Sequence, residues 1–273
     1  MLLPKNIYIN ELFIKSKGSI VVFKILIKIT AVITLALSAT HVFTDEASED
    51  SSFPNFGIEV FSCNYNEDKN LGDLLKVTKK WNQWATNNLD HPYSAWLFTP
   101  MFYDKAPSHD VYWVGTSDSM ITLGAVQDKW LKEGGKFQKA FSNIITCDSR
   151  KMYQGQSLRY TLESAASGNA QFFGCSFKET ATPEKFIAGT IGFRAFVDTL
   201  DLKEAVWRWW PSVGHFDRPE WNFLEVVGSG SLEQRFANKA KYDDNNGDAI
   251  WWENNNEVLD CSYIADASYI QIK

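Results

Sequence analysis

Phe61-Ser-Cys63-Asn-Tyr65 and Phe173-Gly-Cys175-Ser-Phe177 share one pattern, in which a cysteine stands between two aromatic residues at alternate positions. The second stretch begins 112 residues after the first. Offsets of 111 to 114 residues relate further similar residues: Asn70 with Thr182, Leu74 with Phe186, Trp81 with Phe193, Trp84 with Phe196, Trp96 with Trp207, Val114 with Val226 and Cys147 with Cys261. So many matches near one spacing predict that the chain is a tandem duplication.

Each copy is predicted to follow the element order β-α-β-β-α-β, which is that of a ferredoxin-like unit. Alternating apolar residues predict strands at 59–65, 94–102 and 110–115 in the first copy and at 171–177, 205–210 and 221–227 in the second. Helices begin after residues of N-cap type, which are Asn70, Ser119, Thr182 and Ser231. A short strand then reaches the second cysteine of each copy, and another follows at 152–160 and 263–272.

The domain boundaries follow from the repeat and from local composition. An apolar core of about eleven residues at 29–39 is too short to span a bilayer and is typical of a signal peptide, here assigned to residues 1–44. If translation started at Val21 or Val22, the signal peptide would have an ordinary length. The alternative to a cleaved signal peptide is an uncleaved N-terminal anchor. A disordered acidic linker at 45–56, a unit at 57–162, a small polar linker at 163–170 and a second unit at 171–273 complete the predicted organisation.

Four cysteines in an exported chain predict two disulfides, because periplasmic and secreted proteins fold under oxidising conditions. In a ferredoxin-like sheet the first and last strands are neighbours, so Cys63 is expected to pair with Cys147 and Cys175 with Cys261. The alternatives are buried free thiols or a metal site. Neither a CxxC spacing nor clustered histidine supports a metal, and none is predicted.

Composition narrows the range of partners. The formal net charge is −6, which disfavours binding to nucleic acid or to an anionic membrane surface. No stable transmembrane anchor is expected. The chain contains 11 Trp and 19 Phe, and large aromatic side chains line ligand pockets as well as fill cores.

On its element order and duplication, the chain over residues 57–273 resembles the dimeric α/β-barrel superfamily, which includes NIPSNAP-like, EthD-like and antibiotic-biosynthesis-monooxygenase domains. The resemblance implies an α+β fold of two tandem ferredoxin-like βαββαβ units that form a fused dimeric α/β barrel. The sheets would enclose a pocket, the helices would lie outside, and the fused chain would be a monomer. Members of the superfamily include cofactor-free monooxygenases and haem-binding enzymes.

The candidate ligand-binding residues lie on the central strands of the two copies. Trp96 and Phe98 match Trp207 and Trp209, and alternation places all four on one face of the sheet. A charged residue in a buried strand must be paired or must face a ligand, so Arg208 is either in a salt bridge or, with Tyr112, orients a ligand. The predicted set is Trp96, Phe98, Tyr112, Trp207, Arg208 and Trp209. The alternative is an interior filled by aromatic side chains.

Candidates for catalysis are few. His109 precedes a strand in the first copy, and His215 and Arg218 occupy the corresponding hairpin of the second, where they could form an acid/base pair or bind haem. Solvated loops explain the same residues, and the chain contains no GxSxG, P-loop or dinucleotide-binding glycine motif. The sequence therefore favours an exported binding protein or small enzyme for an apolar or aromatic small molecule, without a cofactor. The alternatives are an interaction module with a filled barrel and a haem-binding or cofactor-free oxygenase-type enzyme.

Overall fold

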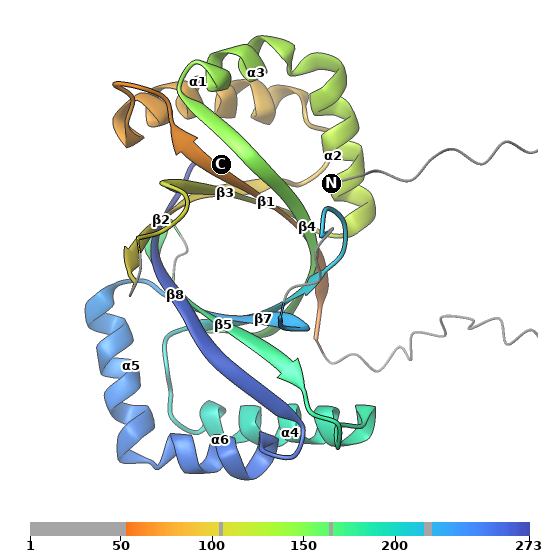
Figure 1. Cartoon of the computed structure of the whole chain (residues 1–273), viewed down its shortest axis with the longest axis vertical. Coiled ribbons are helices and arrows are strands. Elements are labelled where there is room, and N and C mark those ends of the chain that lie inside the picture. The colour runs from red at the N-terminus through yellow and green to blue at the C-terminus, as the bar shows by residue number, and fades with distance from the viewer. Residues whose placement is uncertain (1–52, 104–105, 164–165, 216–219) are drawn as a thin grey trace, which may run out of the picture. The chain divides into compact units, whose positions relative to one another are not determined.

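The computed structural model describes residues 53–103, 106–163, 166–215 and 220–273. Eight antiparallel strands form a closed barrel in the order β1-β3-β2-β8-β5-β7-β6-β4, which Figure 1 shows end on. The strands are β1 (Asn55–Tyr65), β2 (Ser94–Phe102), β3 (Val111–Ser117), β4 (Ile145–Tyr160), β5 (Ser167–Phe177), β6 (Ala205–Pro211), β7 (Phe223–Ser229) and β8 (Leu259–Gln271). The predicted signal peptide and most of the acidic linker lie outside the described residues.

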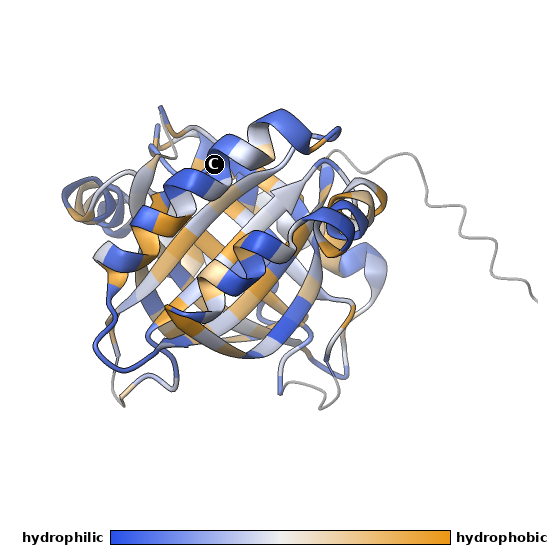
Figure 2. Ribbon diagram, turned by 90° about the horizontal axis from the view of Figure 1, so that it is seen from above, coloured by the Kyte–Doolittle hydropathy of each residue, from blue (hydrophilic) through white to orange (hydrophobic). Residues whose placement is uncertain are grey.

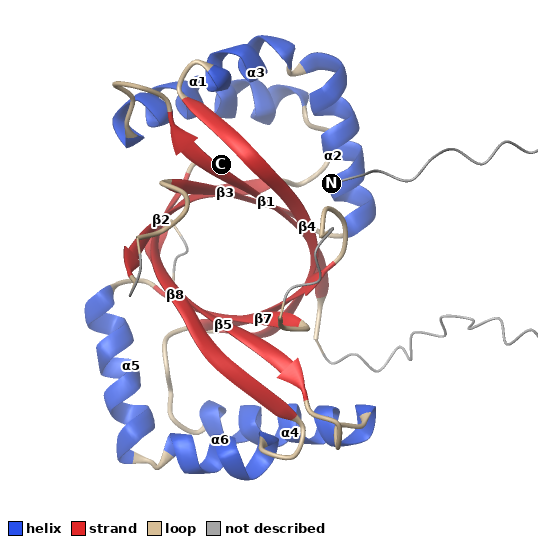
Figure 3. Ribbon diagram, in the orientation of Figure 1, coloured by secondary structure: helices blue, strands red, loops and turns tan. Residues whose placement is uncertain are grey.

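Six helices in the described part of the chain lie outside the barrel, in two groups on opposite sides (Figure 3). They are α1 (Leu71–Asn88), α2 (Met120–Glu133), α3 (Gly135–Ser142), α4 (Pro183–Asp198), α5 (Leu232–Asp244) and α6 (Gly247–Asn255). The α+β class and the barrel expected from the sequence are confirmed. None of the described helices is long and apolar enough to cross a membrane.

The two halves of the barrel have the same strand order, β4-β1-β3-β2 and β8-β5-β7-β6. Two long strands join them, since β4 pairs with both β1 and β6, and β8 pairs with both β5 and β2. The separate strands predicted at 152–160 and 263–272 are therefore wrong: they are continuations of β4 and β8. The strand β5 also begins at Ser167, inside the segment predicted as a linker.

Both disulfides have the predicted pairing. Cys63 is bonded to Cys147 and Cys175 to Cys261, and each pair occupies directly opposed positions on neighbouring strands, β1 with β4 and β5 with β8. The described chain contains no free cysteine. The free-thiol and metal alternatives are thereby excluded for these four residues.

The helices begin where capping residues were predicted. The Asn70 side chain accepts a hydrogen bond from the Gly72 amide at 2.8 Å, and the Ser231 hydroxyl accepts from the Gln234 amide at 3.1 Å. The sequence missed α3 and α6, which follow α2 and α5 after very short turns. Asn246 makes the second turn with a φ of 57°, a left-handed conformation that asparagine tolerates better than most residues.

Alternation along the strands creates two kinds of buried layer. One set of side chains fills the barrel, and the other packs beneath the helices on each side. Figure 2 shows strongly hydrophobic residues along the strands, while the helices carry hydrophilic and hydrophobic positions in turn. A ligand site can therefore lie either inside the barrel or between the barrel wall and a helix group.

Candidate ligand-binding site

The barrel interior contains most of the residues predicted to bind a ligand. Trp96, Phe98, Tyr112, Trp207 and Trp209 all belong to its apolar cluster. The rings form a chain of contacts across the interior, with centroid distances of 6.0 Å from Phe98 to Phe172, 5.7 Å from Phe172 to Trp209, and 5.9 Å from Trp209 to Tyr153. Rings from both halves thus fill much of this space, and ligand binding inside the barrel stays a prediction.

Arg208 does not face the interior. It lies on the opposite side of β6, beneath α4, where its Nε is 3.2 Å from Glu225 and its Nη1 donates to the Thr190 hydroxyl at 2.8 Å. Its guanidinium also lies over the ring of Phe186, 4.6 Å from the centroid. The salt-bridge interpretation of Arg208 is therefore confirmed, and its placement in the barrel pocket is corrected.

The histidine candidates lie on two different hairpins. His109 Nε2 is 2.8 Å from Asp148, and its Nδ1 is 2.9 Å from the Ser108 hydroxyl. His215 Nε2 is 3.1 Å from the Met152 carbonyl oxygen, and burial lowers the pKa of His215. Arg218 lies outside the described residues. Neither histidine lines the cavity described next, and their catalytic roles stay a prediction.

A cavity of about 250 Å³ lies between the outer face of the first half-barrel and the helices α1, α2 and α3. Its walls are largely aromatic: Phe61, Trp81, Trp84, Trp113, Trp130 and Phe141. Several rings meet at steep angles, such as Trp81 and Trp113 at 77° with centroids 4.7 Å apart. Such edge-to-face packing is a favoured arrangement of aromatic rings and stabilises the walls of the cavity.

The polar end of the cavity is built around Glu59, which comes from β1 and is 1% exposed. One carboxylate oxygen accepts a hydrogen bond from the Tyr93 hydroxyl and the other accepts from the Gln127 side-chain amide. Trp113 Nε1 donates to the Tyr93 oxygen at 2.9 Å, which holds that phenol in place. Arg150 stands on β4 with its guanidinium 5.2 Å from the centroid of the Phe61 ring.

Gly115 makes room for this group of side chains. It lies directly opposite Glu59 in the pairing of β1 with β3, and a Cβ atom there would stand 2.0 Å from the Tyr93 hydroxyl oxygen. In the second half the matched positions are Gln171 and Val227, which also face each other. Val227 leaves no such space and residue 171 is a glutamine, so the buried pair of a carboxyl group and a tyrosine is particular to the first half.

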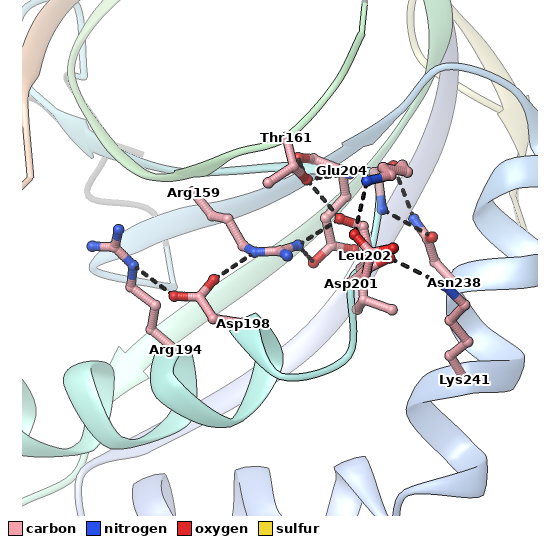
Figure 4. Close-up of polar contacts among 10 residues, drawn as sticks. Arg159, Thr161, Arg194, Asp198, Asp201, Leu202, Glu204, Asn238 and Lys241 are labelled. Atoms are coloured by element: carbon pink, nitrogen blue, oxygen red, sulfur yellow. Dashed lines mark hydrogen bonds and ion pairs between the residues drawn. The ribbon is translucent and has the colours of Figure 1, made fainter.

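The helix layer of the second half contains buried ion pairs beside an apolar cluster. Figure 4 shows Arg159, whose guanidinium is 2.8 Å from Asp198 and 3.2 Å from Glu204 and also donates to the Leu202 carbonyl at 3.0 Å. Together with Arg208 and Glu225, these residues add paired charges to a layer that also holds the apolar cluster around Cys175 and Phe223. The two halves therefore share their strand order and differ in the chemistry of their helix-facing sides.

Burial raises the pKa of Glu59 from 4.5 to about 7, although the Tyr93 hydroxyl and the charge of Arg150 act in the opposite direction. Burial and the neighbouring Glu59 raise the pKa of Tyr93 well above 10.0. Near neutral pH, Glu59 can therefore exist with or without its proton, while Tyr93 stays a hydrogen-bond donor. A carboxyl group in this state can accept a proton from a bound molecule or give one to it.

We expect Glu59→Gln to remove a pH dependence of stability. The folded protein holds the Glu59 proton up to about pH 7 and the unfolded chain only up to about 4.5, so stability falls as pH rises between these values. The free energy of unfolding of the parent should drop by roughly 3 kcal/mol relative to the variant across this window. Urea titrations at pH 4.5 and 7.5 measure the difference.

A matched variant checks the cause of that shift. Tyr93→Phe removes a donor that lowers the pKa of Glu59 in the folded protein, so the window of falling stability should extend to higher pH while its lower limit near 4.5 stays the same. Identical pH profiles for the parent and Glu59→Gln would show that Glu59 titrates as an ordinary carboxyl group.

The sequence did not single out Glu59, Tyr93 or Gln127. The available signal was an acidic residue inside the apolar stretch Ile58-Glu59-Val60-Phe61, together with a glycine in the middle of a later strand. Alternation places Glu59 on the same face as Phe61 and Cys63, which is the helix-covered face. Glu59 pairs with residues 34 and 68 positions away, and the sequence alone does not reveal these partners.

Comparison with known proteins gives a fold likeness only. No protein-family model matches the chain, and no curated protein matches it in sequence. A chlorite dismutase from Candidatus Nitrospira defluvii in complex with imidazole has 9% identity and a TM-score of 0.46, covering 80% of this chain and 91% of that one.

Two other solved structures are similar to the same extent. A heme-binding protein from Thermus thermophilus has 9% identity and a TM-score of 0.43, covering 80% of this chain and 93% of that one. A protein from Lactobacillus acidophilus NCFM, assigned as a monooxygenase, has 10% identity and a TM-score of 0.49, covering 81% and 95%. Since all three TM-scores lie below 0.5, neither a superfamily nor a reaction is inferred from these likenesses.

Proposed function

We propose that this protein binds a small, largely apolar molecule in the cavity between the first half-barrel and α1, α2 and α3. The observation that carries the proposal is an aromatic-walled cavity of about 250 Å³ with one buried carboxyl group at its polar end. Ligand sites combine such apolar walls with a small number of placed polar groups. The volume lies just below the usual range of about 300–1,000 Å³, which suits a molecule of one or two rings.

Haem is a poor fit to this cavity, although proteins of similar fold include a heme-binding protein and chlorite dismutases. Haem iron is held by His, Cys, Met or Tyr. The described residues that line the cavity include no His or Met, and Cys63 and Cys147 are bonded to each other. Tyr93 is buried, with its hydroxyl committed to Glu59 and Trp113. The donor set therefore favours an organic ligand over haem.

The proposal extends to the architecture and the compartment of the protein. The matching strand order of the two halves supports two tandem ferredoxin-like units that form a fused, monomeric barrel. Two disulfides support export to the periplasm or the medium, because such bonds persist in oxidising compartments.

Quenching of tryptophan fluorescence by 2-naphthol tests the proposed site. Four tryptophans line the cavity, so binding should give saturable quenching in the parent protein. Val126→Phe places a ring in the cavity and should weaken binding roughly tenfold or more, since six displaced ligand carbons forfeit at least about 0.3 kcal/mol each. Ile121→Phe, on the exposed side of the same helix, is the matched control and should bind as the parent does.

Two results would contradict the proposal. One is the absence of saturable quenching in the parent, and the other is equal affinity in Val126→Phe and the parent. Circular dichroism and thermal unfolding of both variants establish that the fold is retained. Native mass spectrometry of protein purified from its own host then identifies a ligand that travels with the chain.

A further inference from the structure

Glu59 differs from the other buried acids of the described chain. Glu204 is paired with Arg159 at 3.2 Å, and Asp266 is paired with Arg235. Glu59 is more deeply buried than either, yet its carboxyl group is hydrogen-bonded by neutral side chains, those of Tyr93, Gln127 and Trp113, and none of the ion pairs among the described residues includes it. A buried carboxylate without a positive partner is strongly disfavoured, so a positive charge brought to it gains more there than at a paired site.

No residue of the cavity wall that comes from the helices places a positive charge next to Glu59. The residues that line the cavity from α1, α2 and α3 are all uncharged: Trp81, Trp84, Val126, Gln127, Trp130, Gln138, Phe141 and Ser142. Tyr93 remains neutral, and Arg150 on β4 is the one cation among the described residues that line the cavity. The charge of Arg150 does reach Glu59 and lowers its pKa, but its effect is smaller than that of burial, because Arg150 is exposed while Glu59 is shielded from water.

The aromatic walls suit the same kind of ligand. Trp81, Trp84, Trp113 and Trp130 surround the space next to the carboxyl group, and a cation near an indole face is attracted by its π electrons. A neutral apolar molecule would contact the aromatic walls but would leave Glu59 without a positively charged partner. A flat molecule with an ammonium group would use both features.

We infer that the cavity selects organic cations of the arylalkylamine class, with the ammonium group donating to Glu59 and the ring system held among the tryptophans. The inference rests on the proposed binding function and adds the chemical class of the ligand. Binding needs the ionised carboxylate, so below neutral pH the protein must release the Glu59 proton when the cation enters.

The test compares 2-naphthylmethylammonium with its neutral isostere 2-naphthylmethanol in the complete protein. At pH 8 the cation should bind roughly tenfold to a hundredfold more tightly, the range expected for a hydrogen bond to a charged group. In Glu59→Gln this preference should disappear while the alcohol still binds. Asp128→Asn removes an exposed charge from the same helix as Gln127 and should keep the preference.

A second measurement requires no variant. Calorimetry at pH 5.5 in buffers of different ionisation enthalpy should show nearly one proton released per cation bound, and almost none at pH 8.5. Equal binding of the two probes in the parent, or an undiminished preference in Glu59→Gln, would overturn the inference and leave the binding function standing. Failure of both probes to bind the parent would remove the proposed function as well.

Discussion

Replacing Cys63 and Cys147 together by alanine is expected to lower the free energy of unfolding by about 4.5 kcal/mol, and replacing Cys175 and Cys261 should cost the same. The two bonds close loops with sequence separations of 84 and 86 residues, and a cross-link stabilises a fold by restricting its unfolded chain. Alanine is chosen because Cys63 and Cys175 are fully buried and a serine hydroxyl would lack a partner there. Urea unfolding of the parent and the two double variants measures the loss.

The two bonds should differ in their effect on ligand binding. Cys63 and Cys147 line the cavity, whereas Cys175 packs with Phe223, Val258 and Leu259 under the other helix group. Loss of the first bond should therefore weaken quenching by 2-naphthol, and loss of the second should leave it unchanged. A loss of stability below about 1 kcal/mol for either pair would contradict the loop-closure argument.

Arg208→Leu is expected to destabilise the protein by about 3–5 kcal/mol, the usual cost of removing one partner from a buried ion pair. Arg208 is 4% exposed, and its loss leaves Glu225 without its cation beneath α4. Thr190 would not be left unpaired, because its hydroxyl also donates to the Phe186 carbonyl at 2.8 Å. The predicted cost thus comes mainly from the isolated carboxylate.

The first half of the barrel supplies the control for this experiment. Arg208 and Glu225 face each other across β6 and β7, and the matched residues Leu97 and Trp113 face each other across β2 and β3. The fold therefore accepts an apolar pair at this position. The double variant Arg208→Leu with Glu225→Leu should recover most of the lost stability. A double variant no more stable than Arg208→Leu would show that the guanidinium acts through Phe186 and Phe223 instead.

The repeat, with the alternation and capping residues inside each half, was sufficient to predict the strand order up to each second cysteine and the disulfides, but not the helices α3 and α6. A ferredoxin-like order of elements places the first strand of each half beside its last, and the pairs Cys63–Cys147 and Cys175–Cys261 were predicted from that neighbourhood. The boundaries were less accurate, since β4 and β8 continue past their cysteines as single long strands. Each long strand pairs with strands of both halves, β4 with β1 and β6 and β8 with β5 and β2, and this pairing exists only in the closed barrel.

Alternation along a strand also determined which residues share a face. Trp207 and Trp209 point one way and Arg208 the other, as a period of two requires. That pattern does not reveal whether a cavity lies inside the barrel or on the helix-covered side of the sheet. The interior rings contact one another, and the cavity lies beneath the helices of the first half.

Periodicity and repeat spacing are properties of the chain before it folds, so the sequence by itself determined the α+β class, the matching element order of the halves, the cysteine pairs and the aromatic barrel interior. The cavity depends on residues that meet only after folding, with Tyr93 and Gln127 reaching Glu59 from 34 and 68 positions away. The two halves also differ at single matched positions, such as Gly115 in the first half and Val227 in the second. Only the tertiary structure decided that one half encloses an unpaired carboxyl group and the other a set of ion pairs, because burial and partner contacts set the cost of each charge.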